Sequence, residues 1–251
     1  MKKVVRVFAL MFSLMLIVGA FASCGTGASE NILVVGTNAE FAPFESFDDD
    51  KNFIGFDIDL MKEIGKKIDR EIKFENFDFD ALVAAVGTRC DVAIAALTVD
   101  EERALAVDFS ETYFTAKQNV IVMKDSDIAS ADDLKGLRIG AQSGTTGAGI
   151  AEEIDNVTFK GYDKAALAVL DLKNGNLDAV IVDRNPAAEF VKVNTDMKAI
   201  GEAFFEDEFY AVAVKKGESE LLAQINQALS ELKADGTYDR LVAEHIVGTA
   251  E

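Results

Sequence analysis

The order of apolar and amphipathic segments predicts an α/β protein with mostly parallel sheets. Apolar runs of strand length alternate with stretches that have the spacing of amphipathic helices. The run DVAIAAL at 91–97 is apolar after its first residue, which is typical of a strand buried on both faces. Because parallel strands need a long crossover between them, usually a helix, this alternation favours parallel pairing.

The predicted elements follow one another from residue 32 to residue 246. Strands are expected at 32–37, 71–77, 91–97, 119–124, 137–141, 157–162 and 178–183. Helices are expected at 56–68, 80–86, 164–175 and 218–246, the last divided in two at Gly236. A helix, a glycine, an aspartate and an apolar strand occur at 80–96 and again at 164–182. This repeat leaves two architectures open, which are two similar lobes and one continuous sheet.

The composition suits one large domain or two small ones. The chain has 251 residues, 49% hydrophobic and 27% charged, with only 2 prolines. The formal net charge is −19 and no dense run of Lys and Arg exists, so we expect no nucleic-acid partner. The acidity either only keeps the surface solvated or also attracts cationic small molecules.

The N-terminal segment has the features of an export signal. Positive residues precede an apolar run at 7–21, which is too short to cross a bilayer comfortably. We therefore expect residues 1–23 to be a signal peptide and the chain to be exported.

Two cysteines have different predicted fates. FASC at 21–24 is similar to the lipobox of bacterial lipoproteins, in which the cysteine becomes the lipid-bearing N-terminus, whereas AFA at 20–22 offers an ordinary cleavage site. We expect Cys24 to carry lipid on the outer face of the cytoplasmic membrane, with 24–29 as its flexible tether; the alternative is a periplasmic protein. Cys90 is then left without an intrachain partner and is expected to be a buried structural thiol.

Polar residues gather where four predicted strands end. In open parallel sheets, ligands bind beyond the carboxyl ends of strands. The four segments at these ends are NAEFAPFE, TVDEER, QSGTTG and the turn DRNP that starts at Asp183.

The segment TVDEER offers an anion site. Thr98 and Glu101 have the T-x-x-E spacing of a capping box, which predicts a short helix with N–H groups free at its start. Arg103 lies one turn further. It either pairs locally with Asp100, Glu101 or Glu102, or holds a ligand carboxylate through two parallel hydrogen bonds.

The other junctions leave similar alternatives. SGTTG at 143–147 is a glycine turn before a helix and either holds an anion or only completes the turn; it lacks the lysine of a P-loop, which disfavours nucleotide binding. Asp183 either accepts hydrogen bonds from an ammonium group or caps the helix that starts near Pro186. Phe41 and Phe44 either stack on a ligand or pack in the core.

A carboxylate clamp, an ammonium acceptor and aromatic walls are the complement of a free α-amino acid. No catalytic set accompanies them, because the single His245 lies in the C-terminal helix and Cys90 has no nearby base. His, Cys and Asp residues show no metal-ligand spacing in the sequence, so neither a metal nor a cofactor is expected.

Six motifs over residues 32–246 carry a specific resemblance. They are GTNAEFAPFE, GFDIDL, DVAIAALTVDEERALAVDFSETYF, LKGLRIGAQSGTTG, LDAVIVD and ALSELKADGTYDRL. In them the chain resembles the solute-binding proteins, family 3, of polar amino-acid ABC transporters, in their bacterial lipoprotein form. The resemblance implies a two-lobed periplasmic-binding-protein fold (type II, Venus-flytrap) with two hinge strands. Residues 30–117 and 211–251 would form lobe 1, and 118–210 lobe 2.

The resemblance also implies which residues hold the backbone end of the ligand. Arg103 would clamp the α-carboxylate, helped by the Thr98 amide and by Thr146. Asp183 would take the α-ammonium, with the Ala96 carbonyl and the Thr98 hydroxyl.

The same resemblance assigns the side-chain end. Phe41 and Phe79 would enclose the ligand side chain, Asn38 and Gln142 would line its pocket, and Thr145 would be a further contact. Relatives that bind basic or amide side chains often have an acidic residue where Asn38 stands, which weakens an assignment to arginine or lysine. Glu40 and the general acidity favour a basic ligand.

The resemblance implies a binding protein, not an enzyme. Its partners would be a free polar amino acid and the permease and ATPase of an ABC importer, and the protein would be a monomer. The alternatives on the same fold are an enzyme similar to cyclohexadienyl dehydratase, which needs a positioned acid or base, and a ligand-sensing domain of a receptor.

Overall fold

The computed structural model describes residues 31–201 and 204–247. The expected signal peptide at 1–23, the lipidated Cys24 and the tether at 24–29 lie outside the described residues. Within the described part, two separate multi-stranded sheets exclude a single continuous sheet.

The first sheet has five strands in the order β4–β1–β5–β13–β6. Strands β1 (Ile32–Thr37) and β5 (Val92–Ala93) are parallel. Strand β13 (Ala213–Lys215) runs antiparallel to both β5 and β6 (Val107–Phe109), and β4 (Glu71–Asn76) forms the other edge. Helices α2 (Phe56–Lys67) and α8 (Ser219–Ala234) contribute side chains to the core of this sheet.

Shorter elements surround this sheet. Strands β2 (Ser46–Phe47) and β3 (Phe53–Ile54) pair as a two-stranded antiparallel hairpin. The short helices of this part are α3 (Phe79–Ala85) and α4 (Glu101–Ala106).

The second sheet has the order β11–β7–β10–β8–β9, and β12 also pairs with β7. Its strands are β7 (Phe114–Met123), β8 (Arg138–Gln142), β9 (Thr158–Tyr162), β10 (Ala179–Asp183), β11 (Met197–Ile200) and β12 (Asp207–Tyr210). The helices of this part are the 3₁₀ turn η1 (Ala131–Leu134), α5 (Thr146–Glu153), α6 (Ala165–Lys173) and α7 (Arg184–Val193).

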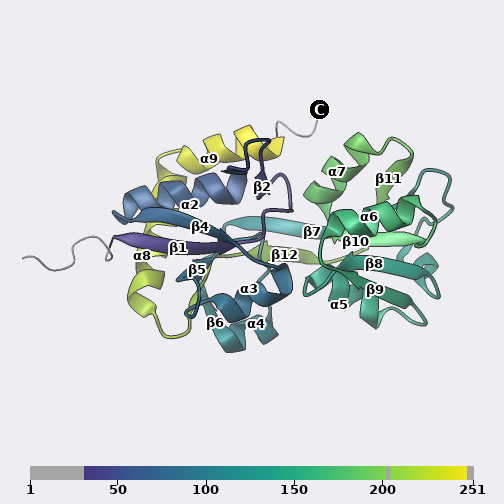
Figure 1. The fold of residues 1–251 in the computed structure, drawn as a ribbon, viewed down its shortest axis with the longest axis horizontal. Helices are drawn as coiled ribbons and strands as arrows, with labels where there is room; N and C mark the ends of the chain where they lie inside the picture. Colours follow the sequence, from purple (N-terminus) through teal and green to yellow (C-terminus); the bar gives the residue numbers. More distant parts are fainter. Residues whose placement is uncertain (1–30, 202–203, 248–251) are drawn as a thin grey trace, which may run out of the picture. The chain divides into compact units, whose positions relative to one another are not determined.

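Two strands carry the chain between the sheets. Strand β7 leaves the first sheet after β6, and β12 returns the chain to β13. The first half of β7 pairs with β12, where Phe114 is opposite Tyr210, and its second half pairs with β10, where Gln118 is opposite Asp183. Both strands run between the groups of elements labelled around β1 and around β8 (Figure 1). The fold is therefore the two-lobed periplasmic-binding-protein fold with two hinge strands.

The expectation of mostly parallel sheets is wrong in part. Strands β8, β9 and β10 are parallel to one another, as are β1 and β5. Strand β7 is antiparallel to β10, β11 and β12, and β13 is antiparallel to both its neighbours. The antiparallel pairs arise because the connecting strands join each sheet from the opposite direction, which the alternation of elements does not reveal.

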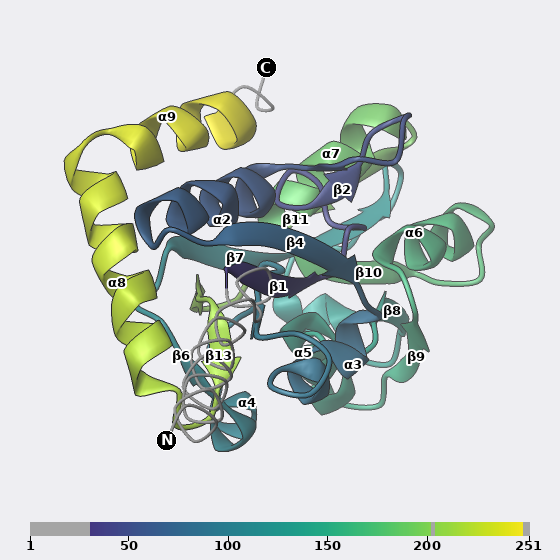
Figure 2. The same cartoon turned by 60° about the vertical axis from the view of Figure 1, so that its left-hand side comes forward.

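The C-terminal segment forms two helices as predicted. Gly236 adopts φ 80°, a left-handed conformation that glycine tolerates without steric cost, and it separates α8 from α9 (Thr237–Val242). A short π-helical segment, η2 (Ala243–Val247), follows. Helices α8 and α9 both contact α2, which Figure 2 shows from the side.

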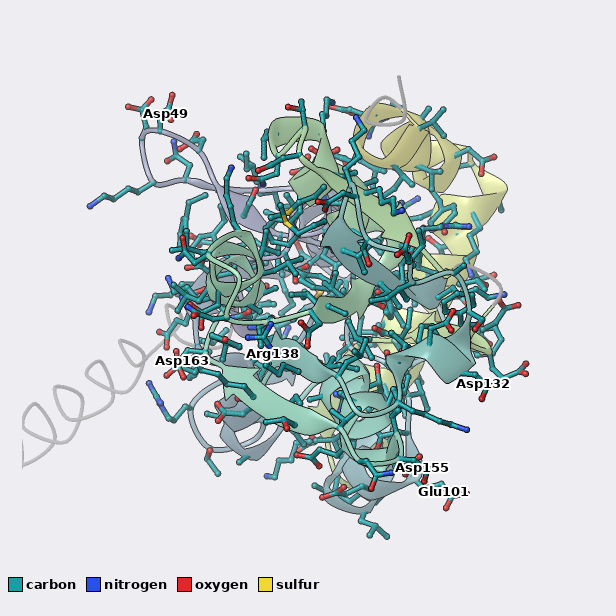
Figure 3. The ribbon with its side chains drawn as sticks, turned by 90° about the vertical axis from the view of Figure 1, so that its right-hand side faces the viewer. Asp49, Glu101, Asp132, Arg138, Asp155 and Asp163 are labelled. Carbon is teal, nitrogen blue, oxygen red and sulfur yellow. The ribbon has the colours of Figure 1, made fainter. Side chains whose placement is uncertain are left out.

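Residues 92–97 of the run are buried as expected, whereas Asp91 is exposed, and only Val92 and Ala93 form a strand. Ala96 has φ 46°, so the backbone leaves the extended conformation beside the functional residues. Most charged residues of the described part lie outside the core, as Figure 3 shows for Asp49, Asp155 and Asp163 at the periphery. The acidity of the chain is thus mostly a surface property.

Candidate functional site

A small cavity gathers residues from the parts of the chain around both sheets. It is lined by Phe41, Phe79, Ala96, Thr98, Arg103, Gln142, Thr145, Thr146 and Asp183. These are nine of the ten predicted site residues. The tenth, Asn38, lies directly behind Gln142, whose Nε2 donates to Asn38 Oδ1 at 3.0 Å.

Arg103 is held by three acceptors. Its Nε lies 3.0 Å from Asp100 Oδ2, its Nη1 donates to the Thr98 carbonyl at 2.7 Å, and its Nη2 donates to the Gly144 carbonyl at 2.9 Å. The local ion pair that the sequence allowed therefore exists. A guanidinium has five N–H groups, so one on Nη1 and one on Nη2 remain for another partner. Burial lowers the pKa of Arg103, and the charge of Asp100 opposes this.

The predicted capping box of Thr98 and Glu101 is wrong. The N-cap of α4 is Asp100, whose side chain accepts from the backbone N–H of Arg103 at 2.8 Å. Thr98 lies before the helix and donates its hydroxyl to Glu208 at 2.7 Å. An aspartate is as good an N-cap as threonine, and the T-x-x-E spacing did not distinguish the two.

Asp183 lies at the N-terminal end of α7 but does not cap it, because its side chain makes no cap hydrogen bond. Instead its Oδ1 accepts from the Tyr210 hydroxyl at 2.6 Å. Burial, and then the charge of Glu208, raise the pKa of Asp183 to about 7. The carboxylate is thus buried at the cavity wall, where an ammonium group would stabilise its charged form.

The backbone of Ala96 is hydrogen-bonded to a buried carboxyl group. Its backbone N–H donates to Asp57 Oδ2 at 2.7 Å, and the Tyr113 hydroxyl donates to the same oxygen at 2.7 Å. Burial raises the pKa of Asp57 to about 6, and burial together with the Asp57 charge raises the pKa of Glu45 well above its ordinary value. Both carboxylates are fully inaccessible, so they support the cavity from behind.

The two amide side chains form an ordered pair. Asn38 Nδ2 donates to the Phe77 carbonyl at 2.7 Å, which leaves Asn38 Oδ1 to accept from Gln142. Gln142 Nε2 also donates to the Asp163 carbonyl at 3.1 Å. Both Nε2 hydrogens are used, so Oε1 is the amide atom that Gln142 can offer to a ligand.

The SGTTG turn completes the start of α5. Thr145 caps the helix, because its hydroxyl accepts from Ala148 N at 3.2 Å. Gly144 has φ 76°, and an added Cβ there would lie 2.8 Å from the Asp80 Cα, so only glycine lets this turn approach α3. Thr146 donates its hydroxyl to Glu208 at 2.8 Å and accepts from Gln118 Nε2 at 3.1 Å.

The aromatic residues have two fates. Phe44 is in the core, with its ring 5.0 Å from Phe114 and 5.3 Å from Tyr210. Phe41 and Phe79 line the cavity, and the Arg103 guanidinium lies 5.5 Å from the Phe79 ring centroid. The core alternative is thus confirmed for Phe44.

A wider groove adjoins the cavity and shares Phe79, Thr98, Arg103, Thr145 and Thr146 with it. Seven carboxylate side chains line this groove, which are those of Asp80, Asp100, Glu101, Glu102, Glu152, Glu153 and Glu208. Arg103 is the one cation among its lining residues. The approach to the cavity is therefore strongly negative.

Sequence reasoning missed three residues of the site. Tyr210 and Gln118 come from the hinge strands and contact Asp183 and Thr146. Glu208 also comes from a hinge strand and contacts both threonines. No local motif marks them, because their partners lie far away in the chain.

Cys90 is buried and unpaired among the described residues, as expected of a structural thiol. Burial raises its pKa to about 11, which keeps the thiol protonated and unreactive at neutral pH. Among residues 31–201 and 204–247, no helix has the length and apolarity needed to cross a membrane.

The fold brings together one group that sequence spacing did not predict. Ligand atoms of Asp59, Glu244 and His245 lie within 4.8 Å of one another. His245 Nε2 is 3.0 Å from Asp59, Lys62 is 2.9 Å from Asp59, and Arg240 is 3.2 Å from Glu244. Each of the three side chains thus has a partner within the protein.

Comparison with known proteins agrees with the fold. The profile of the bacterial extracellular solute-binding proteins, family 3, matches residues 33–248. A probable histidine-binding protein of Neisseria gonorrhoeae is 34% identical over 218 residues, covering 84% of this chain and 81% of the relative. The ABC transporter arginine-binding protein 1 of Escherichia coli K12 is 34% identical over 223 residues, covering 86% and 91%.

Comparison with solved structures also finds amino-acid-binding proteins. An ancestral arginine-binding protein bound to arginine superposes with a TM-score of 0.83 at 42% identity, covering 86% of this chain and 98% of that one. The chain therefore belongs to family 3 of the bacterial extracellular solute-binding proteins.

Proposed function

We propose that the protein is the extracytoplasmic substrate-binding component of an ABC importer, and that it captures a free polar L-amino acid and delivers it to a membrane permease. The observation that carries this proposal is the presence of Arg103 and Asp183 on one cavity. A cation and an anion facing one small cavity suit the two charged ends of an amino acid.

The ligand carboxylate binds to Arg103. The two remaining N–H groups, one on each Nη atom, provide two donors from the fork. The contacts from Asp100, Thr98 and Gly144 hold the guanidinium in place before the ligand arrives. Because the guanidinium is already held in place, less side-chain conformational entropy is lost when the ligand binds.

The ligand ammonium binds to Asp183. The Tyr210 hydroxyl donates to Oδ1, and the ligand ammonium uses the remaining acceptor capacity of the carboxylate. The Ala96 carbonyl and Thr98 hydroxyl complete the ammonium site in this proposal. An ammonium beside Asp183 lowers the pKa of that carboxyl from its ligand-free value of about 7.

The ligand side chain lies between Phe41 and Phe79 and reaches Gln142. Because Gln142 Nε2 is used by Asn38 and the Asp163 carbonyl, its free amide atom is an acceptor. This polarity selects a side chain with N–H donors, which basic and amide amino acids have and acidic ones lack. The relatives named for histidine and arginine bind side chains of that kind.

The charges outside the cavity favour a basic ligand by a different route. The negative charge of Glu40 is balanced by Lys164, because the two side chains pair at 2.6 Å. The seven carboxylates of the groove supply the negative potential instead. Such a potential raises the local concentration and the association rate of a cation.

Lobe 1 comprises residues 30–117 and 211–251 and lobe 2 residues 118–210 in this proposal. Among the described residues outside the hinge strands β7 and β12, three hydrogen bonds cross between these lobes, which are Asn38–Gln142, Glu40–Lys164 and Arg103–Gly144. Ligand binding selects this closed arrangement through hinge motion at β7 and β12. The ligand residues are the ten predicted ones.

The export and anchoring of the protein follow the same proposal. Residues 1–23 are the signal peptide, and Cys24 is the lipidated N-terminus of a monomer that docks on the permease. Mass spectrometry of the exported protein checks this, because a diacylglyceryl-modified Cys24 has a defined mass. An N-terminus at Ser23 would contradict lipidation at Cys24. Light scattering measures the molar mass in solution and so tests whether the protein is a monomer.

The test of the function is a binding screen of protein that has been unfolded and refolded to strip carried-over ligand. A ligand that binds only the native state raises the melting temperature. We expect a shift with L-arginine, L-histidine, L-lysine or L-glutamine and none with L-glutamate or L-leucine. The largest shift with an acidic or apolar amino acid would contradict the side-chain assignment, and no shift with any amino acid would contradict the function.

Catalysis on a cyclic carboxylate is the second candidate, because Asp183 has the pKa near neutrality that a general acid or base needs. The screen therefore includes prephenate. Turnover of prephenate without any amino-acid binding would favour the enzyme, and binding of amino acids without turnover favours the transport function.

A further inference from the structure

Glu208 lies where both lobes meet the cavity. It comes from the hinge strand β12, and a single oxygen, Oε2, is 2.7 Å from Thr98 Oγ1 and 2.8 Å from Thr146 Oγ1. A carboxylate oxygen carries no hydrogen, so both hydroxyls must be donors in these bonds. Thr98 and Thr146 are both lining residues of the cavity, whereas Glu208 lines only the adjoining groove.

This arrangement decides what the two hydroxyls can offer a ligand. A threonine hydroxyl has one hydrogen, and Glu208 takes it from both residues. Toward the cavity, Thr98 Oγ1 can then only accept a hydrogen bond. Thr146 Oγ1 already accepts from Gln118 Nε2 at 3.1 Å, which leaves the backbone N–H as the donor that Thr146 offers.

The charge of Glu208 acts on the same part of the cavity. It contributes to the raised pKa of Asp183, and it opposes the effect of burial on the pKa of Arg103. Asp183 is the proposed ammonium site, and it lines the same cavity as Thr98. Glu208 thus adds negative potential and an oriented acceptor at one end of the cavity.

We propose that Glu208 is a positioning residue that fixes the polarity of this end of the cavity, so that it accepts an α-ammonium group and discriminates against ligands without one. It does not touch the ligand; it acts through the Thr98 hydroxyl and through its charge. This inference rests on the proposed amino-acid-binding function.

A purely structural role predicts a different result. Glu208 also ties Thr98 of one lobe to Thr146 of the other, so its loss can weaken closure. Weaker closure reduces the affinity for every ligand by the same factor. Loss of the ammonium preference reduces only the affinity for ligands that carry the amino group.

The experiment is isothermal titration of matched ligand pairs. The pairs are L-arginine with 5-guanidinopentanoate, and L-glutamine with 5-amino-5-oxopentanoate, which differ only in the α-amino group. In Glu208→Gln, the amide nitrogen can donate to a threonine hydroxyl and turn its hydrogen away from the hinge. We expect the affinity for the amino acid, divided by that for its partner without the amino group, to fall about tenfold or more. The reason is that the hydrogen of the threonine hydroxyl then faces the ammonium group.

The matched control is Asp207→Asn. Asp207 is the neighbouring carboxylate on the same strand and pairs with Lys117 at 3.0 Å on the surface. We therefore expect the affinity ratio of the matched ligands in Asp207→Asn to equal that of the wild type. An unchanged ratio in Glu208→Gln would overturn the inference, whether both affinities fall together or neither does.

A second pair of variants keeps the test decisive if Glu208→Gln does not fold. Thr98→Val removes the hydroxyl in a side chain of similar shape, and Thr98→Ser keeps it. We expect Thr98→Val to lower the affinity ratio and Thr98→Ser to preserve it, and equal ratios in both would overturn the inference. Wild-type protein that binds no amino acid in these titrations would instead refute the proposed function itself.

Discussion

The backbone N–H of Ala96 donates to Oδ2 of Asp57 at 2.7 Å, and this bond holds an alanine at φ 46° on the cavity wall. A left-handed conformation costs a non-glycine residue roughly 1–2 kcal/mol. A buried acceptor that pairs with the Ala96 N–H offsets this cost.

Removing the acceptor tests the relationship. Asp57→Ala leaves the Ala96 N–H and the Tyr113 hydroxyl without this partner, so we expect a loss of about 1–3 kcal/mol in the free energy of unfolding and weaker ligand binding. Urea denaturation and titration calorimetry measure the two effects.

The companion variant is Ala96→Gly, because glycine adopts a positive φ without steric cost. In that background we expect Asp57→Ala to weaken ligand binding less. An equal loss of affinity with alanine and with glycine at position 96 would show that Asp57 does not act through this backbone conformation.

Arg103→Lys should reduce ligand affinity by about a hundredfold. A lysine keeps the charge but lacks the planar fork that serves Asp100, two carbonyls and a ligand carboxylate at once. The control is Arg138→Lys, since Arg138 makes a similar pair with Asp178 at 2.6 Å on the surface. Near-wild-type affinity for Arg103→Lys, measured by calorimetry, would contradict the carboxylate assignment.

The stability of the ligand-free protein should depend on Asp183. Its pKa is raised from 3.8 to about 7 on folding, so the native state binds more protons than the unfolded state between those values. Its contribution to stability is fully present below pH 3.8 and is lost as the pH rises through about 7. Urea denaturation of Asp183→Asn from pH 4 to 8 should show a smaller decline than the wild type, and an identical decline would refute the assignment.

Ligand binding should release protons below neutral pH. An ammonium stabilises the charged form of Asp183, so the carboxyl group loses its proton on binding wherever it was protonated, and affinity falls as the pH drops below about 7. Calorimetry at pH 6 in two buffers of different ionisation enthalpy measures this release. We expect release in the wild type and less in Asp183→Asn; equal values would contradict the ammonium site.

The Glu40–Lys164 pair should favour closure slightly. The two groups lie 2.6 Å apart across the proposed lobes, and both are partly exposed. An exposed ion pair contributes roughly 0.2–1 kcal/mol, so Lys164→Gln should lower affinity by up to about fivefold and reduce its salt dependence. Lys135→Gln is the control, because Lys135 pairs with Asp132 within one turn. A salt dependence equal to that of the wild type would argue against the pair as a closure contact.

Much of the fold and most of the cavity could be predicted from the sequence. Alternating apolar and amphipathic segments placed β1, β4, β8, β9, β10, α2, α6 and α8 within a few residues, because periodicity depends on local burial. Arg103, Asp183 and the SGTTG turn follow predicted strands, and strand ends are where a ligand site lies in this kind of fold.

The tertiary structure alone decided how these residues are used. It made Asp100 the helix cap in place of Thr98, shortened the strand at Ala96, and brought Glu208 to two threonines 110 and 62 residues away in the chain. It also set the hydrogen-bond polarity of Gln142 through Asn38 and the Asp163 carbonyl. A sequence pattern reports which residues are buried and where strands end, whereas the direction of each hydrogen bond depends on partners that only the folded chain brings together.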